Sequence, residues 1–433
     1  MEGEVEFHTF VGWIHRLRKQ GSLLFIILRT HKEPHAYIQC VMKGKLAKTC
    51  SKNPGVYREA TISLTGTLHD DARAPGGVEL KVTDWELIGP SDEEIEGRIR
   101  PESGPEVMAD NRHIQLRGTH MSNVVKLRAA ILRGFRHHFE EEDVTEVSPP
   151  TIVQTQVEGG STLFKLKYFD QEAYLTQSSQ LYLETACPAV GDCFCVLPSF
   201  RAEKSRTRRH VSEFTHLEME YAFIDFEGLL TRLEKMVKDV VKYVCEKKGD
   251  LLEEVNPGMV EKCKTLVEEP FIRMKYTEAI DWLKEHEVYK NEEEKIFYTY
   301  EDDIPEKPER FMVDTIGKPI LLTHFPTHQK PFYMKTPADH PEVTESVDLL
   351  MPSVGEIIGG SMREGDYEKI MDGFKREGIK PDPYYWYTDL RKFGSFPHGG
   401  AGVGVDRFVC WLGGIDHIRD VILYPRNCNR CKP

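Results

Sequence analysis

Long apolar runs are missing from this sequence. The longest clear one, from Leu23 to Leu28, is far below the ~20 residues that a membrane-spanning helix needs. The first residues, MEGEVEFHTF, are acidic and show neither the basic nor the apolar region of a signal peptide. The sequence therefore predicts a cytoplasmic protein that does not enter a membrane.

Cysteine pairs suited to a disulfide framework or a zinc site are also lacking. The ten cysteines are scattered over 433 residues, which does not suit a disulfide-stabilised fold. Cys428 and Cys431 form a single C-x-x-C without a second ligand pair at zinc spacing. We expect no structural disulfides and no metal at this pair.

An excess of positive charge is absent too, because the net charge is -13. This argues against a generic binder of polyanions, although affinity for nucleic acid depends on where the cations lie rather than on their sum. Hydrophobic residues at 40% and charged residues at 29% are ordinary for a globular protein. The length predicts two or three domains.

Five short apolar-rich runs between residues 7 and 90 predict a small β-barrel. They are FVGWIHRLRKQ, SLLFIILRT, AYIQCVMKG, EATISLTGTLHD and GVELKVTDWELIGP. Five strands fit an OB-fold, which binds single-stranded nucleic acid by stacking bases on aromatic rings beside cations. Phe25, preceded by Arg16 and Arg18 and followed by Gln39 on the next strand, is a candidate for such stacking. It equally fits a core position in its apolar run.

The remaining chain divides at a change of composition. Residues 1–92 form the predicted OB-fold domain, and residues 93–115 are polar, acidic and rich in proline and glycine, as in a hinge or linker. Residues 116–433 form the second domain, whose first helix is expected to begin near Ser122 as its N-cap. Another helix is expected over 226–248, followed by a charged, irregular insertion around 249–320.

The stretch from Phe194 to Phe223 predicts two strands joined by a basic loop. In its second half, an apolar set alternates with a mainly polar one: Thr215, Leu217, Met219, Tyr221 and Phe223 against Phe214, His216, Glu218 and Glu220. Arg201 and Glu203 would share a face of the preceding strand. The loop carries the cations Lys204, Arg206, Arg208, Arg209 and His210. This arrangement suits a nucleotide and its phosphates, and an amphipathic hairpin with a solvated loop would show the same pattern.

The last third of the chain adds a glycine-rich element, PHGGAGVGVDRFVCWLGG. Too few residues follow Arg407 for the βαβ unit of a dinucleotide-binding fold. The glycines instead indicate a strand whose backbone approaches a ligand, with Arg407 at a helix start. Asp348 and Glu356 are candidate ligands of a divalent cation.

Together these parts resemble the class II aminoacyl-tRNA synthetases of subclass IIb, and among them the asparaginyl enzymes of eukaryotes. FRAEKSRTRRHVSEFTHLEME resembles motif 2, GGAGVGVDRFVCWL motif 3, the helix leading to Val147 and Pro150 motif 1, and GWIHRLRKQG the start of the anticodon-binding OB domain. The resemblance covers nearly the whole chain. It implies an OB-fold β-barrel followed by an α+β catalytic domain, an antiparallel sheet flanked by helices, in a homodimer.

The activity implied by this resemblance is the ATP-dependent attachment of L-asparagine to tRNA(Asn) through an asparaginyl-adenylate. The residues implied in ATP binding are Arg201, Glu203, Arg209, His210, Val211, Phe214, Glu356, Gly404 and Arg407. Arg201 and Arg407 would be the catalytic residues, with Phe214 stacked on adenine. Asp348 and Glu356 would hold Mg²⁺. The amino-acid pocket would be formed by Glu158, Gln177, Gln180 and Arg363, and the central anticodon base would be read by Phe25 and Gln39.

Position 183 distinguishes the amino acids that this scaffold serves. Aspartyl enzymes typically carry QSPQ-x-x-K, whereas this chain has QSSQLYLE, with Leu183 at the lysine position and Glu184 beside it. An aspartate carboxylate would lose its cation and meet extra negative charge, and burying it unpaired costs several kcal/mol. Arg363 would repel lysine, so neutral asparagine is favoured. At position 406 the family usually has glutamate, whereas this chain has Asp406. Its side chain is one methylene shorter, which puts the reach of its carboxylate in question.

Three other assignments stay open at this point. An aspartyl-tRNA synthetase shares the scaffold. A tRNA-independent asparagine synthetase should lack the barrel of residues 7–90. A non-catalytic paralogue should have lost residues such as Arg201, Arg407 or Glu356, all of which are present.

Overall fold

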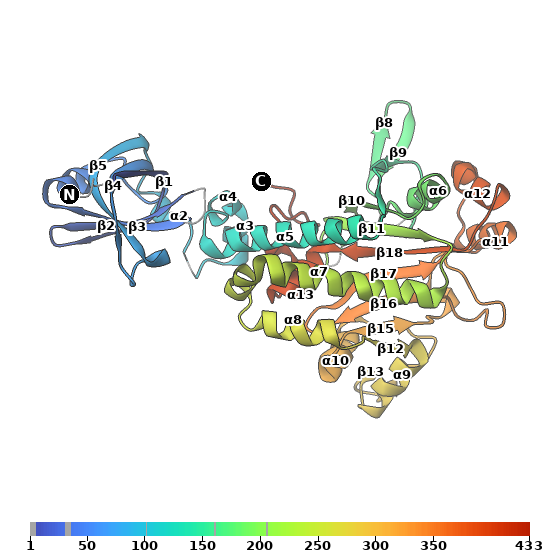
Figure 1. Cartoon of the computed structure of the whole chain (residues 1–433). Coiled ribbons are helices and arrows are strands. Elements are labelled where there is room, and N and C mark those ends of the chain that lie inside the picture. Colours follow the sequence, from blue (N-terminus) through green and yellow to red (C-terminus); the bar gives the residue numbers. More distant parts are fainter. Residues whose placement is uncertain (1–5, 31–35, 101, 160–161, 205–206) are drawn as a thin grey trace. The chain divides into compact units, whose positions relative to one another are not determined.

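The protein, seen in a computed structural model, forms two compact units, Met1–Gln115 and Leu116–Pro433 (Figure 1). The structure describes residues 6–30, 36–100, 102–159, 162–204 and 207–433, so Arg206 of the basic loop lies outside the described residues. In this described part of the chain, no helix is both long and apolar enough to cross a membrane.

The first unit contains a closed five-stranded barrel in the order β1-β2-β3-β5-β4, which confirms the predicted barrel. Its strands are β1 (His8–Gln20), β2 (Leu23–Arg29), β3 (Tyr37–Lys43), β4 (Thr61–Asp70) and β5 (Val78–Gly89). Alternate side chains such as Leu24, Ile26 and Leu28 fill the interior, as the period of a strand requires. One helix, α1 (Gly44–Lys52), follows β3, and a 3₁₀ turn, η1 (Pro75–Gly77), precedes β5.

Short helices occupy the stretch for which the composition indicated a linker. They are α2 (Ile95–Arg98), α3 (Pro105–Asp110) and α4 (Arg112–Gln115). Their combined length is small, and α3 begins at Pro105 with Gly104 as its N-cap.

The second unit is built on an eight-stranded sheet in the order β12-β15-β16-β17-β18-β11-β10-β6. The strands are β6 (Thr145–Glu146), β10 (Cys193–Phe200), β11 (Glu213–Ala222), β12 (Ile272–Lys275), β15 (Ile320–Thr323), β16 (Ser346–Met351), β17 (Gly355–Met362) and β18 (His398–Gly404). The five central pairings are antiparallel, and the outer pairs β12–β15 and β10–β6 are parallel. The sheet is therefore mixed at its edges, where an antiparallel one was expected.

Three helices cover one face of this sheet: α5 (Thr119–Glu141), α7 (Phe226–Val255) and α13 (Val405–Gly413) (Figure 1). The stripe predicted for α5 is fully buried, at Val124, Leu127, Ile131 and Phe135. The predicted N-cap is wrong, because α5 begins at Thr119 with Gly118 as its cap.

The segment around 249–320 was expected to be irregular, and this expectation is wrong. After the end of α7 it forms α8 (Met259–Glu268), β12, α9 (Tyr276–Glu285), the small pair β13 (Tyr289–Asn291) and β14 (Ile296–Phe297), α10 (Glu306–Ile316) and the start of β15. Its charges lie on the outer faces of amphipathic helices, while Leu283, Met312 and Val313 form a core with β15 and β16. The sequence interpretation considered only the many charged residues and missed the helical spacing of the apolar ones.

The other face of the sheet carries α6 (Gln180–Val190) and the smaller elements around it. These are the three-stranded sheet of β7 (Ile152–Val153), β8 (Lys165–Tyr168) and β9 (Gln171–Leu175), the helices α11 (Tyr367–Glu377) and α12 (Tyr385–Lys392), and the 3₁₀ turns η3 (Thr327–Gln329) and η4 (Asp382–Tyr384). A further 3₁₀ turn, η5 (Ile418–Asp420), packs against α13.

The predicted hairpin is formed by β10 and β11, with Ser199 opposite Phe214. Leu217, Met219 and Tyr221 point into the core beneath the helices, as expected. Phe223 does not, because β11 ends at Ala222 and the positive φ of 53° at Phe223 turns its ring to solvent, where it is 81% exposed. Arg201 and Glu203 also lie beyond their strand, since β10 ends at Phe200.

Candidate active site

A cavity of about 490 Å³ lies on the face of the sheet opposite the long helices. Its walls come from β11, β16, β17, β18, the loop of the hairpin and the start of α13. The predicted residues that line it are Glu158, Gln180, Arg201, Glu203, Arg209, His210, Val211, Phe214, Asp348, Glu356, Arg363, Gly404 and Arg407. Residues up to 249 positions apart in the chain, as Glu158 and Arg407 are, thus meet at one site.

Glycines in β18 allow the polar side chains of β11 to lie across that strand. A Cβ at Gly400 would lie 2.2 Å from a carboxylate oxygen of Glu220, and one at Gly402 would lie 2.3 Å from Nε2 of His216. No side chain fits at such distances. The glycine-rich pattern was attributed to a ligand approaching the backbone, and at these two positions the approaching groups belong to the protein itself.

Arg201 and Phe214 form one end of the cavity. The guanidinium carbon of Arg201 lies 5.3 Å from the centroid of the Phe214 ring. Its Nη2 pairs with Glu158 at 2.5 Å, and its buried Nε has no hydrogen-bond partner among the described residues. A buried cationic donor without a partner suits an anionic ligand, and the ring beside it suits a planar base.

Two partly buried carboxylates face each other across Gly359. A Cβ at that glycine would lie 3.4 Å from oxygens of both Asp348 and Glu356. Burial raises the pKa of Asp348 to about 6 although Lys330 lies 3.0 Å away. Burial acts on Glu356 in the same direction, but Arg407, at 3.0 Å, brings its pKa down to about 2.

These carboxylates fit a magnesium ion that is shared with phosphates. No cluster of three or more His, Cys, Asp or Glu side chains that could hold an ion is found among the described residues. Mg²⁺ commonly uses one or two carboxylates together with waters and substrate phosphates, so Asp348 and Glu356 are a sufficient protein contribution.

Glu309 on α10 is a residue of this site that the sequence did not reveal. Its carboxylate binds Nη1 of Arg209 at 3.1 Å and accepts the backbone N–H of Glu356 at 3.3 Å. Glu306, one turn earlier, lies 3.5 Å from Nε of Arg209. Burial raises the pKa of Glu309 to about 7. The negative charges of Glu356 and Asp348 also raise this pKa, whereas the positive charge of Arg209 lowers it. No pattern in the charged segment distinguished Glu309 from its acidic neighbours.

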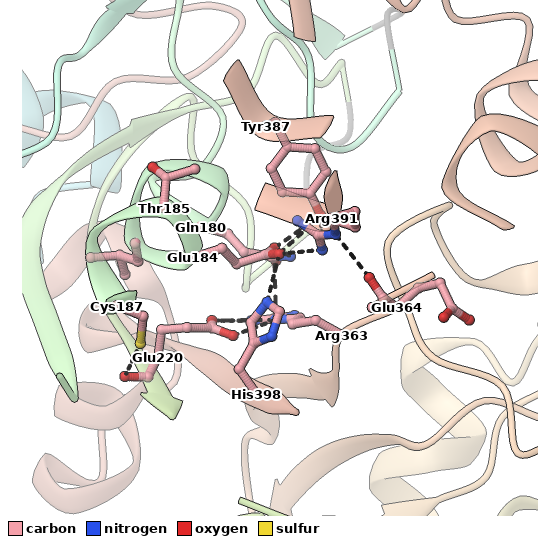
Figure 2. A network of polar contacts seen from close by, with 12 residues as sticks. Gln180, Glu184, Thr185, Cys187, Glu220, Arg363, Glu364, Tyr387, Arg391 and His398 are labelled. Carbon is pink, nitrogen blue, oxygen red and sulfur yellow. Dashed lines mark hydrogen bonds and ion pairs between the residues drawn. The ribbon is translucent and has the colours of Figure 1, made fainter. Parts of the chain in front are cut away.

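A buried network of paired charges forms the other end of the cavity (Figure 2). Arg363 binds Glu220 through two parallel hydrogen bonds, Nε to Oε1 at 3.0 Å and Nη2 to Oε2 at 2.9 Å. Its Nη1 donates to Ser361 at 2.9 Å. Arg363 lines the cavity, whereas Glu220 is fully buried behind it.

Glu184 is the second anion of the network, and its environment corrects the sequence interpretation. Its carboxylate accepts from Arg391 at 2.7 Å, Tyr387 at 3.0 Å and His398 at 3.1 Å (Figure 2). It is fully buried and does not line the cavity, so it does not present extra negative charge to a substrate. Leu183, by contrast, does line the cavity, as predicted.

Gln177 lies behind the cavity wall instead of in it. Its Oε1 accepts the backbone N–H groups of Val157 at 3.0 Å and Glu158 at 3.2 Å, and its Nε2 donates to Thr162 at 2.7 Å. This places Gln177 as the support of the segment that carries Glu158.

Asp406 reaches its partners despite the shorter side chain. Its carboxylate pairs with Arg128 of α5 and accepts the backbone N–H of Thr215 at 2.9 Å. The start of α13 is thereby fixed to both α5 and β11.

Phe25 and Gln39 lie in the first unit, on the outer surface of its barrel. Ile27 pairs with Gln39 across β2 and β3, and Phe25 lies two residues from Ile27 on the same face. Phe25 is half-buried and outside the barrel core, which removes the core alternative. Gln39 donates to Glu79 at 2.7 Å.

The comparisons with known proteins agree over nearly the entire chain. The profile of the tRNA synthetases class II (D, K and N) matches residues 104–428, and that of the OB-fold nucleic acid binding domain matches residues 8–88. Cytoplasmic asparagine--tRNA ligase of Mus musculus is 51% identical over 98% of this chain and 75% of its own length. The chain belongs to the asparaginyl group of class II tRNA synthetases.

Two further relatives support the assignment to this group. Cytoplasmic asparagine--tRNA ligase of Saccharomyces cerevisiae is 50% identical over 98% of this chain and 76% of its own length. The structure of Entamoeba histolytica asparaginyl-tRNA synthetase in complex with asparaginyl-adenylate superposes with a TM-score of 0.91, at 45% identity over 99% of this chain and 97% of that one. Asparaginyl synthetases therefore share both units of this fold.

Proposed function

We propose that this protein attaches L-asparagine to tRNA(Asn), using ATP and forming an asparaginyl-adenylate. The observation that carries the choice of amino acid is the pairing of Arg363 with Glu220 beside Leu183. The family and the cavity support the reaction type. The relatives named above act as asparagine--tRNA ligases by name, and one was solved with asparaginyl-adenylate.

The Arg363–Glu220 pair favours a neutral side chain. Arg363 presents donors to the cavity, but its charge is already balanced from behind by Glu220. An asparagine carboxamide oxygen can accept from Arg363 and add no charge. An aspartate carboxylate would add a negative charge that no lysine at position 183 balances, and desolvating it costs several kcal/mol.

ATP would occupy the opposite end of the cavity. Phe214 would stack on the adenine, with Arg407 on the other side of the nucleotide. Arg201 would bind the α-phosphate with its Nε, which has no hydrogen-bond partner among the described residues. Glu203, Arg209, His210, Val211 and Gly404 complete this wall. Asp348 and Glu356 would hold Mg²⁺, which neutralises phosphate charge when bound.

The reaction needs no nucleophile from the protein. In the first step an oxygen of the asparagine carboxylate attacks the α-phosphorus, the bond to the β-phosphate oxygen breaks, and pyrophosphate leaves. In the second step a terminal ribose hydroxyl of the tRNA attacks the carbonyl carbon of the adenylate, the bond from that carbon to the phosphate oxygen breaks, and AMP leaves with its phosphate taking up the hydroxyl proton. Arg201 stabilises the charge that develops on the phosphate, and the cavity aligns the two substrates.

The first unit would bind the anticodon, with Phe25 stacking on the central base and Gln39 reading its edge. The OB-fold profile over residues 8–88 supports this role and disfavours a tRNA-independent synthetase. We also propose a cytoplasmic homodimer, on the basis of the family and of the names of the relatives. A monomer in sedimentation analysis at micromolar concentration would contradict the dimer.

Amino-acid-dependent exchange of pyrophosphate into ATP tests this proposal. We expect exchange with asparagine and ATP, and little with aspartate or lysine. Exchange with aspartate alone would indicate an aspartyl enzyme, and absence of exchange with all three would indicate a non-catalytic relative.

A further inference from the structure

Gln180 and Glu184 lie one helical turn apart at the start of α6, and only the first of them lines the cavity. Nε2 of Gln180 donates to Oε1 of Glu184 at 3.0 Å (Figure 2). Oε1 of Gln180 has no hydrogen-bond partner among the described residues. The amide nitrogen is therefore directed at the buried network, which leaves the amide oxygen for the cavity.

The charge of Glu184 is what determines this orientation. Burial acts to raise the pKa of Glu184, but the Arg391 guanidinium and the His398 ring outweigh it and hold that pKa well below its usual range. An ionised carboxylate only accepts hydrogen bonds, so the Gln180 amide has to present its NH₂ group to it. With a neutral amide at position 184, both orientations of Gln180 would be satisfied.

The same carboxylate oxygen places Gln180 close to the amino-acid pocket. Oε1 of Glu184 lies 3.0 Å from Nε2 of Gln180 and 4.0 Å from Nε of Arg363. When the carboxamide of a bound asparagine accepts a hydrogen bond from Arg363, the α-carbon of that asparagine lies two bonds from the carboxamide carbon. The α-ammonium then falls within the neighbourhood of Gln180. A charged donor gains about twice as much as a neutral one from a hydrogen bond to a correctly oriented acceptor.

We propose that Glu184 is a positioning residue that orients the Gln180 amide so that its oxygen accepts from the α-ammonium of asparagine. This inference rests on the proposed function, because it takes asparagine as the occupant of the pocket. Arg391, Tyr387 and His398 act one step further away, by keeping Glu184 in place and charged.

Three probes separate this role from a general structural one. L-Asparagine carries all groups, succinamate lacks the α-ammonium, and 3-aminopropanamide lacks the α-carboxylate but keeps the ammonium. Their dissociation constants are measured by isothermal titration calorimetry on the full chain. For Glu184→Gln we expect asparagine and 3-aminopropanamide to bind about tenfold more weakly, and succinamate to change by less than about twofold.

A second variant guards against loss of the fold, because Glu184→Gln leaves Arg391 without its counter-ion. The double substitution Glu184→Met with Arg391→Met removes both charges, and it should show the same selective loss. Asp192→Asn is the matched control, since Asp192 pairs with Arg232 at 2.7 Å elsewhere in the same unit and should change none of the three constants.

The outcomes for the two proposals are distinguishable. Equal weakening of all three probes, or no weakening of asparagine, in a variant with wild-type circular dichroism would overturn the role of Glu184 and leave the proposed function standing. Failure of the wild-type protein to bind asparagine would overturn the proposed function, and the role of Glu184 with it.

Discussion

The carboxylate of Asp406 at the start of α13 pairs with the guanidinium of Arg128 on α5, and it also accepts the N–H of Thr215 on β11. The Asp406 side chain is 2% exposed and that of Arg128 is 18% exposed. The Asp406 carboxylate therefore links α13, α5 and β11 directly beside Arg407.

Replacing Asp406 by alanine should lower the free energy of unfolding by about 3–5 kcal/mol, because it leaves Arg128 without a counter-ion in a mainly buried position. Urea denaturation followed by circular dichroism measures this. The control is Asp416→Ala, whose carboxylate is 81% exposed and pairs with Arg208 at the surface, and it should change stability by less than about 0.5 kcal/mol. Similar values for both variants would contradict the structural role of Asp406.

Arg201→Ala should reduce asparagine-dependent pyrophosphate exchange by at least about 100-fold, because the developing charge on the α-phosphate loses a preorganised donor. The far-UV circular dichroism spectrum should stay unchanged. Arg376→Ala removes an exposed arginine of α11 and should leave exchange intact. Exchange at the wild-type rate in Arg201→Ala would refute the assigned role.

Leu183→Lys should raise the use of aspartate relative to asparagine by about tenfold or more, since it supplies a cation for a carboxylate at the cavity wall. The ratio of kcat/KM for the two amino acids in the exchange assay measures the effect. Leu183→Met keeps the wall apolar at similar volume and should leave the ratio as it is. An unchanged ratio in the lysine variant would show that position 183 does not select the substrate.

At pH 8, above the Glu309 pKa of about 7, Glu309→Gln should raise the KM for ATP by about tenfold and leave the KM for asparagine within about twofold, because Arg209 loses its charged hydrogen bond. Glu306→Gln is the matched comparison. Its carboxylate lies farther from Arg209, at 3.5 Å, and is 25% exposed, so the effect should be smaller. A larger effect at Glu306, or a parallel rise in both KM values, would be evidence against this role.

Phe25→Ala should weaken tRNA binding by about 1–3 kcal/mol, the contribution of one base stacked on an aromatic ring, and leave pyrophosphate exchange unchanged. The KM for tRNA in the aminoacylation assay reports the loss. Ile88→Ala, at a 53% exposed position of β5, should have little effect on either assay. Loss of exchange in Phe25→Ala would mean that the substitution acts on more than the anticodon.

Sequence patterns predicted the strands, because a strand depends on residues that are close together in the chain. The five apolar-rich runs in residues 7–90 predicted all five barrel strands, and the alternation after Glu213 predicted β11 and its buried face. The network of Glu184, Arg391, Tyr387 and His398 could not be predicted in the same way, because Glu184 and Arg391 are 207 residues apart and meet where α12 packs against α6. Glu184 was consequently assigned a free charge that it does not present.

The α10 contribution was missed for a different reason. Glu309 lies in a segment where acidic side chains are frequent, and it contacts both Arg209 and the backbone N–H of Glu356, whereas Glu306 approaches Arg209 at 3.5 Å. Glu309 differs from the other acidic residues of the segment in its burial and in its hydrogen-bond partners, and neither can be read from residue type.

The bare backbone of β18 limits how this site can change during evolution. Any side chain at Gly400 or Gly402 would displace Glu220 or His216, so neither position can acquire a group that touches a substrate. A new amino-acid preference is expected to arise from substitutions on α6 and directly after β17, at positions such as Leu183 and Arg363. The nucleotide half of the cavity can then remain constant while the other half diverges.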